Sequence, residues 1–120
     1  MVKCLLVGVG GGIGAILRYL IGLIPIGAQN SFPIKTLLIN VIGAFVIGLI
    51  SVSAEKYQVS SLLVLTLKTG VCGGFTTFST FALETDQLIQ SGNYGFTILY
   101  IGLSVVLSVA AVFAAQILMK

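Results

Sequence analysis

"GVCGGFTTFSTF", residues 70–81, interrupts the third long apolar segment of the chain. It holds two adjacent glycines and four hydroxyl side chains, and its three phenylalanines recur at every third position. Glycine and threonine favour the helix less than the leucines around them do. We therefore expect a helix that is broken at its centre, near residues 73–79.

The sequence around this stretch is that of a membrane protein. Of its 120 residues, 58% are hydrophobic and only 8% are charged. A helix that spans the bilayer needs about 20 predominantly apolar residues. Four segments meet this requirement, at 3–25, 33–54, 61–90 and 95–119. We predict an all-α integral membrane protein in which residues 1–120 form one four-helix transmembrane domain, multi-pass in the cell inner (plasma) membrane.

The charged residues give these four spans little preference for one orientation. Four spans place both termini on one side of the membrane, which then carries Lys3, Lys56 and Lys120. The other side carries Lys35 and, near the end of its span, Arg18. Lysine and arginine normally mark the cytoplasmic loops, so this bias is weak. We expect the chain to insert both ways, and two opposite copies to pair as an antiparallel, dual-topology homodimer.

Composition also excludes several classes of function. The six basic residues are scattered along the chain and form no patch for nucleic acid. Cys4 and Cys72 lie in or beside apolar spans without paired spacing, which fits neither a zinc site nor a disulfide framework. The chain has no histidine, and its three carboxylates fall near loops or helix ends. We therefore expect no enzyme.

The first span begins with a glycine-rich stretch, "GVGGGIGA" at residues 8–15. Its small residues recur four apart on several helix faces, which allows a neighbouring backbone to approach closely. The same letters fit the dinucleotide pattern G-x-G-x-x-A, which needs a preceding strand and an acidic residue about 20 positions later. The next carboxylate is Glu55, so we expect helix packing here and no nucleotide.

Two rows of polar or small residues are spaced one helical turn apart. They are Thr36, Asn40, Ala44 and Gly48 in the second span, and Tyr100, Ser104 and Ser108 in the fourth. Residues at this spacing lie on one face of a helix. Hydroxyls bonded to their own helix, with Asn40 joining two helices, would also explain single members. The regular repetition favours a polar pathway.

The predicted break brings backbone groups into the membrane interior. Freed carbonyl groups can coordinate a cation there, as unwound helices of transporters do. Phe75, Phe78 and Phe81 suit an apolar packing face. They also suit a small anion held by ring edges, because the edge of a phenyl ring is positive. Conduction needs binding that is weak enough to allow release, and a ring edge provides it without a fixed charge.

These motifs resemble the Fluc family of fluoride channels, also called CrcB proteins. The resemblance is carried by "GGIGAILRY" at 11–19, "LLINVIGAFVIG" at 37–48 and "GVCGGFTTFSTF" at 70–81, and it covers essentially the whole chain. It implies an antiparallel homodimer with two fluoride pathways and a structural sodium ion at the dimer interface. The implied function is passive, fluoride-selective export of cytoplasmic fluoride down its electrochemical gradient, which reduces fluoride toxicity.

The resemblance also implies roles for single residues. Backbone carbonyls of Gly73 and Thr76 from both subunits would hold the sodium ion. Phe78 and Phe81 would form an aromatic box, with Phe75 outside it. The rest of the fluoride pathway would be lined by Asn40, Thr36, Tyr100, Ser104 and Ser108.

Three ionisable residues fall within or near the spans: Arg18, Lys68 and Glu84. A charge at the centre of a spanning helix costs about 2.5–3.5 kcal/mol on insertion scales. Arg18 and Glu84 match charged positions of the family's motifs and are candidate supporting residues without an assigned role. Lys68 is left as structural, and snorkelling toward a helix end would explain all three equally well.

Two other functions remain open. A small four-helix multidrug exporter uses a membrane-embedded glutamate in its first helix, where this chain has Arg18 and no carboxylate. A nonconducting membrane assembly protein would use its glycine rows only for helix contact. In that case, replacing Phe78 or Asn40 should alter stability without a specific transport defect.

Overall fold

A computed structural model describes residues 1–27 and 31–119 of the chain. Part of the predicted connection at 25–33, and Lys120 from the charge comparison, therefore lie outside the described residues. The described chain contains four helices that are long and apolar enough to cross a membrane, which confirms the expected class. They are α1 (Val2–Gly22), α2 (Ile34–Lys56), the third span (Ser61–Gln90) and α6 (Tyr94–Met119).

The third span is an interrupted helix, as predicted. It consists of α3 (Ser61–Leu65), the π-helix η1 (Thr66–Cys72), α4 (Gly73–Phe75), two extended residues and α5 (Phe78–Gln90). The extended residues are Thr76, with φ −83° and ψ 158°, and Thr77, with φ −149° and ψ 117°. A π-helix has wider turns than an α-helix and often occurs at functional sites. The span is therefore irregular along the turns that lead into its break.

The break lies at the threonines, and the two glycines that were expected to weaken the helix are helical. Gly73 has φ −62° and ψ −37°. The glycines serve a contact instead, because a Cβ on Gly74 would lie 2.9 Å from the Cα of Gly11 in α1. The hydroxyl of Thr77 instead accepts a hydrogen bond from Thr80 N at 3.1 Å and caps α5.

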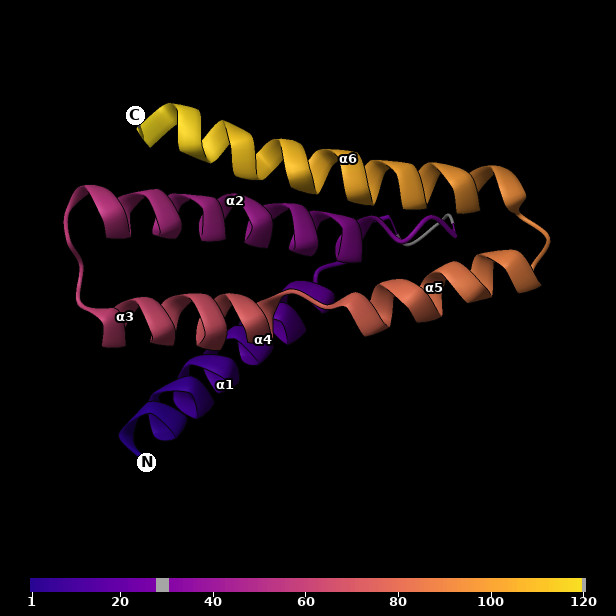
Figure 1. Ribbon diagram of the computed structural model, residues 1–120. Coiled ribbons are helices and arrows are strands. Elements are labelled where there is room, and N and C mark those ends of the chain that lie inside the picture. Colours follow the sequence, from indigo (N-terminus) through magenta and orange to yellow (C-terminus); the bar gives the residue numbers. More distant parts are fainter. Residues whose placement is uncertain (28–30, 120) are drawn as a thin grey trace.

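Helix α1 crosses the third span obliquely beneath its break (Figure 1). Gly10 and Gly14 are buried at this crossing. A Cβ on Gly10 would lie 2.6 Å from Thr66 O, and one on Gly14 would lie 2.7 Å from Phe75 N. The close backbone approach predicted for the glycine-rich start is thus present on one face of α1, and there only glycine fits.

Helices α2 and α6 lie side by side, and the two ends of the chain lie at the same end of the bundle (Figure 1). Gly48 permits close contact between these helices, because a Cβ there would lie 2.9 Å from the Cβ of Ala115. A buried cluster of Leu37, Leu88 and Tyr100 joins α2, α5 and α6 beyond the break. These contacts hold α2 and α6 against the broken span and so form the walls of the site.

Candidate functional site

A cavity of about 390 Å³ opens where α2, the broken third span and α6 meet. Its lining is mostly apolar with a few polar groups, which is the usual character of a ligand site. The predicted site residues that it brings together are Asn40, Gly73, Thr76, Phe78, Phe81, Ser104 and Ser108. These residues lie far apart in the sequence, and the break is where they converge.

Asn40 binds the broken backbone with both ends of its carboxamide. Its Nδ2 donates to Thr77 O at 3.1 Å, and its Oδ1 accepts from Thr77 N at 2.8 Å. Backbone groups inside a membrane must be satisfied within the protein, and these two bonds replace the helical ones lost at the break. An amide carries two N–H donors, so one remains for a ligand in the cavity. The sequence predicted Asn40 as a lining residue but did not indicate this clamp.

The same arrangement leaves carbonyl oxygens free. In a continuous helix Thr77 N would bond to Gly73 O, four residues earlier, but here it bonds to Asn40. Within the described residues, no donor is bonded to the carbonyl of Gly73 or of Thr76. Carbonyl oxygens are ligands that suit hard cations, and unwound helices bind sodium in this way. The donor set therefore fits a sodium ion.

Arg18 reaches a third carbonyl beside the break. Its Nε donates to Gly74 O at 3.2 Å from the half-buried face of α1. The guanidinium thereby ties α1 to the last helical turn before the break. Arg18 does not line the cavity, and its bond to Gly74 O lets it stabilise the broken helix from outside.

Two of the three phenylalanine rings reach the cavity. The Phe78 and Phe81 centroids lie 5.7 Å apart with their planes at 44°, and Phe81 lies 5.0 Å from the Tyr100 ring. Phe75 is buried and lines no part of this cavity. Phe78 is 79% exposed in the single chain, so one side of the pair is open.

The row of residues on α6 divides between the cavity and the protein core. Ser104 and Ser108 line the cavity, and the Ser104 hydroxyl, in a residue only 8% exposed, has no hydrogen-bond partner among the described residues. A buried polar group without a partner costs about 1–3 kcal/mol. The hydroxyl of Ser104 is therefore a group to which a ligand would restore a bond.

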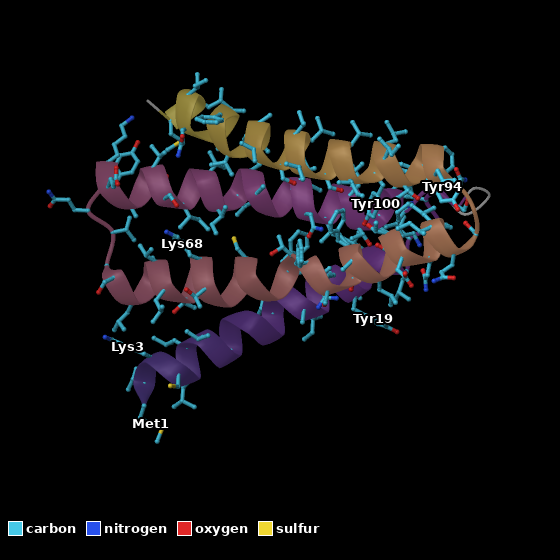
Figure 2. All side chains as sticks on the ribbon, turned by 45° about the vertical axis from the view of Figure 1, so that its right-hand side comes forward. Met1, Lys3, Tyr19, Lys68, Tyr94 and Tyr100 are labelled. Atoms are coloured by element: carbon cyan, nitrogen blue, oxygen red, sulfur yellow. The ribbon has the colours of Figure 1, made fainter. Side chains whose placement is uncertain are left out.

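Tyr100 and Thr36 lie outside this cavity. Tyr100 is fully buried between α6 and α5 (Figure 2), and its hydroxyl donates to Glu84 Oε1 at 2.9 Å. Thr36 is buried beside the same phenol. The structure thus pairs Glu84 with Tyr100, whose ring packs against that of Phe81, and it places Thr36 beside the phenol.

Further residues line the cavity without having been predicted to do so, among them Lys68, Cys72 and Thr77. Cys72 and Thr77 belong to the quoted motif, and Thr77 was missed because its contact with Asn40 spans 37 positions of sequence. Lys68 lies four residues before Cys72, a spacing that puts both on one face of a helix. This spacing from Cys72 was the feature of the sequence that could have predicted Lys68 as a lining residue.

Comparison with known proteins gives a consistent result. The CrcB-like protein family, Camphor Resistance (CrcB), matches residues 5–116. A "Fluoride-specific ion channel FluC" of Azobacteroides pseudotrichonymphae genomovar. CFP2 is 42% identical over 118 residues, which are 97% of this chain and 94% of that protein. Proteins with the same name from Agrobacterium fabrum and Rhizobium etli are each 44% identical, covering 95% and 100% of this chain and 93% and 98% of their own lengths.

Proposed function

Because the chain belongs to the CrcB-like family, we propose that it is a passive, fluoride-selective ion channel through which cytoplasmic fluoride leaves the cell down its electrochemical gradient. It is a multi-pass membrane protein, and its relatives are named as channels rather than as enzymes. Hydrogen fluoride is a weak acid that crosses membranes and dissociates inside a less acidic cell. A passive exit for the anion would relieve this accumulation.

The unpartnered hydroxyl of Ser104 is the observation that carries the proposal. This hydroxyl is buried, and Ser104 lines the same cavity as Phe78 and Phe81. Fluoride is a small anion that must exchange its hydration shell for donors if it is to cross. Hydroxyls, the remaining Asn40 N–H and positive ring edges supply such donors without a full charge in contact with the ion. Binding of this kind is strong enough to replace water and weak enough to permit release.

The polarity of the broken helix supports an anion on one side of the break and a cation on the other. Helix α5 begins at Phe78, which lines the cavity, and the positive end of its dipole lies there. The free carbonyl of Gly73 belongs to the helical turn before the break, whose exposed end is negative, and that of Thr76 belongs to the first extended residue after this turn. An anion pathway and a sodium site can therefore lie next to each other.

The proposed assembly is an antiparallel homodimer with a structural sodium ion at its centre. One chain offers two free carbonyls, and a two-fold axis in the membrane plane would double this number. The openness of Phe78 and the weak orientation bias of the lysines support a second copy. Sodium, when bound, would join two broken helices by electrostatic attraction to their carbonyls.

An efflux experiment tests the proposal. Purified protein is reconstituted into liposomes loaded with equal fluoride and chloride, the voltage is clamped with a potassium ionophore, and each anion is followed with a selective electrode. We expect rapid release of fluoride, negligible release of chloride, and loss of fluoride release in Phe81→Ile. Equal release of both anions would contradict selectivity, and a verified dimer that releases neither anion would favour the assembly protein.

A second experiment removes sodium. Sodium-free preparations should lose both the dimer and fluoride efflux. If dimer stability and efflux stayed unchanged without sodium, the ion would have no structural role.

A further inference from the structure

Lys68 is a charged residue that has no role among the proposed fluoride donors. It lies in η1 and lines the cavity together with Cys72 and with Ser108 of α6. Figure 2 shows Lys68 between α2 and the third span. It is half-buried and is the eighth residue of a 30-residue span. Lys68 therefore lies about two turns from the start of the span and lines the cavity.

No negative partner for this cation is present in residues 1–27 and 31–119. The chain has three acidic side chains, Glu55, Glu84 and Asp86, and none of them lines the cavity. Glu84 already accepts a hydrogen bond from Tyr100. Within the described residues, Lys68 has no hydrogen bond and no ion pair. Its positive charge is thus uncompensated beside a cavity that holds an unpartnered hydroxyl.

Other lysines of the chain are placed differently. Lys35 donates to Gly22 O at 2.8 Å, and Lys56 donates to Met119 O at 3.0 Å, so both satisfy carbonyls at helix ends. A lysine at the centre of a span costs about 2.5–3.5 kcal/mol on insertion scales, and the cost falls toward the ends of the span. Such residues usually face a water-filled cavity and mark an ion pathway. The contrast with Lys35 and Lys56 points to a function for Lys68.

The antiparallel course of the helices places Lys68 at one end of the serine row. Helix α6 runs opposite to the third span (Figure 1), and Phe81 at the far end contacts the Tyr100 ring. Ser104 and Ser108 then lead from the Phe81 end of the cavity to the Lys68 end. An anion at Lys68 would therefore lie in line with the hydroxyl donors.

We propose that Lys68 is an anion-collecting residue, whose ammonium group concentrates fluoride at one end of the cavity and delivers it to Ser108 and Ser104. This inference rests on the proposed channel function and adds a residue that determines its rate. Coulomb attraction acts equally on fluoride and chloride, so Lys68 should set how often an ion arrives and leave selectivity to the donors and rings. Charges of this kind raise arrival rates by about 10–1,000-fold, and salt screens them.

The test compares Lys68→Met, which removes the charge at similar length, with Lys68→Arg, which keeps it. Fluoride efflux from liposomes is measured at low ionic strength and in high potassium gluconate, whose anion is large and organic. We expect Lys68→Met to slow efflux on the order of tenfold at low ionic strength, with little difference in high salt. Lys68→Arg should stay near wild type. Lys56→Met, which removes a cation outside the cavity, is the matched control.

The outcomes separate this inference from the proposed function. If the wild type conducts fluoride and Lys68→Met matches it at low ionic strength, the collecting role is wrong and the channel stands. If the wild type releases no fluoride, the channel itself fails. A changed ratio of fluoride to chloride release would also overturn the collecting role. Should Lys68→Met not assemble, Lys68→Gln replaces it, and loss of assembly in both with Lys68→Arg intact would mean a structural ion pair instead.

Discussion

Asn40 is the single residue on which the broken backbone depends most. Its carboxamide satisfies both the N–H and the C=O of Thr77, and it lines the cavity at the same time. A side chain of this length in α2 can reach the break only because the helices lie close together. Asn40 therefore couples the stability of the fold to the geometry of the cavity.

Replacing Asn40 by Ala should reduce both stability and conduction. The N–H of Thr77 would be left unpaired, at about 1–3 kcal/mol, and the Thr77 carbonyl would lose its bond to Asn40. Thermal unfolding in detergent micelles should shift clearly downward, and fluoride efflux should be lost. Thr85→Ala is the matched control, because its hydroxyl bonds only to Phe81 O on its own helix. Equal unfolding midpoints for both variants would show that the clamp does not hold the break.

At the scale of the elements, the crossing of α1 over the third span depends on the absence of side chains. Gly10 and Gly14 are buried against the backbone of η1 and α4, and Arg18 on the same helix bonds to Gly74 O. A helix that approaches this closely fixes the turns before the break. The free carbonyls are positioned by this contact.

Gly14→Ala should move α1 away from the break. The added Cβ would collide with the backbone of Val71 and Phe75, and overpacking of this kind costs about 1–3 kcal/mol. We expect a lower unfolding midpoint and weaker fluoride efflux. Gly22→Ala on the same helix has nothing within 4 Å of its added methyl group and should behave as wild type. A normal midpoint for Gly14→Ala would mean that the crossing is loose.

The elements differ in how far the sequence could predict them. The long apolar runs were sufficient to place four spans, and "GGFTTFSTF" was sufficient to place a break in the third. The position of the break within that motif was not predictable, because Gly74 is required for contact with Gly11, more than 60 positions earlier. The hydrogen-bond partners of Asn40 and Glu84 likewise depend on how the helices pack, and the spacing of residues along one helix does not predict this packing. Lys68 was visible in the sequence, but its lack of a partner became visible only in the fold.

At the scale of the whole molecule, a single chain leaves the site open. Phe78 is largely exposed, and one chain offers only two free carbonyls, those of Gly73 and Thr76, to the proposed sodium ion. A second, antiparallel copy would cover the rings and complete the carbonyl set. Because the two copies would be related by symmetry, each would carry its own row of serines and its own Lys68. Two equivalent pathways of opposite direction would result, which suits passive flow.

The measurement that tests this account most directly is the reversal potential of the purified channel in a planar bilayer, with a fluoride gradient across the membrane and a chloride gradient in the opposite direction. A passive, fluoride-selective pathway predicts a current that reverses near the fluoride equilibrium potential and does not change when a sodium or proton gradient is imposed. A reversal potential that follows chloride would contradict selectivity. One that moves with the sodium or proton gradient would contradict passive conduction and would favour a coupled exporter.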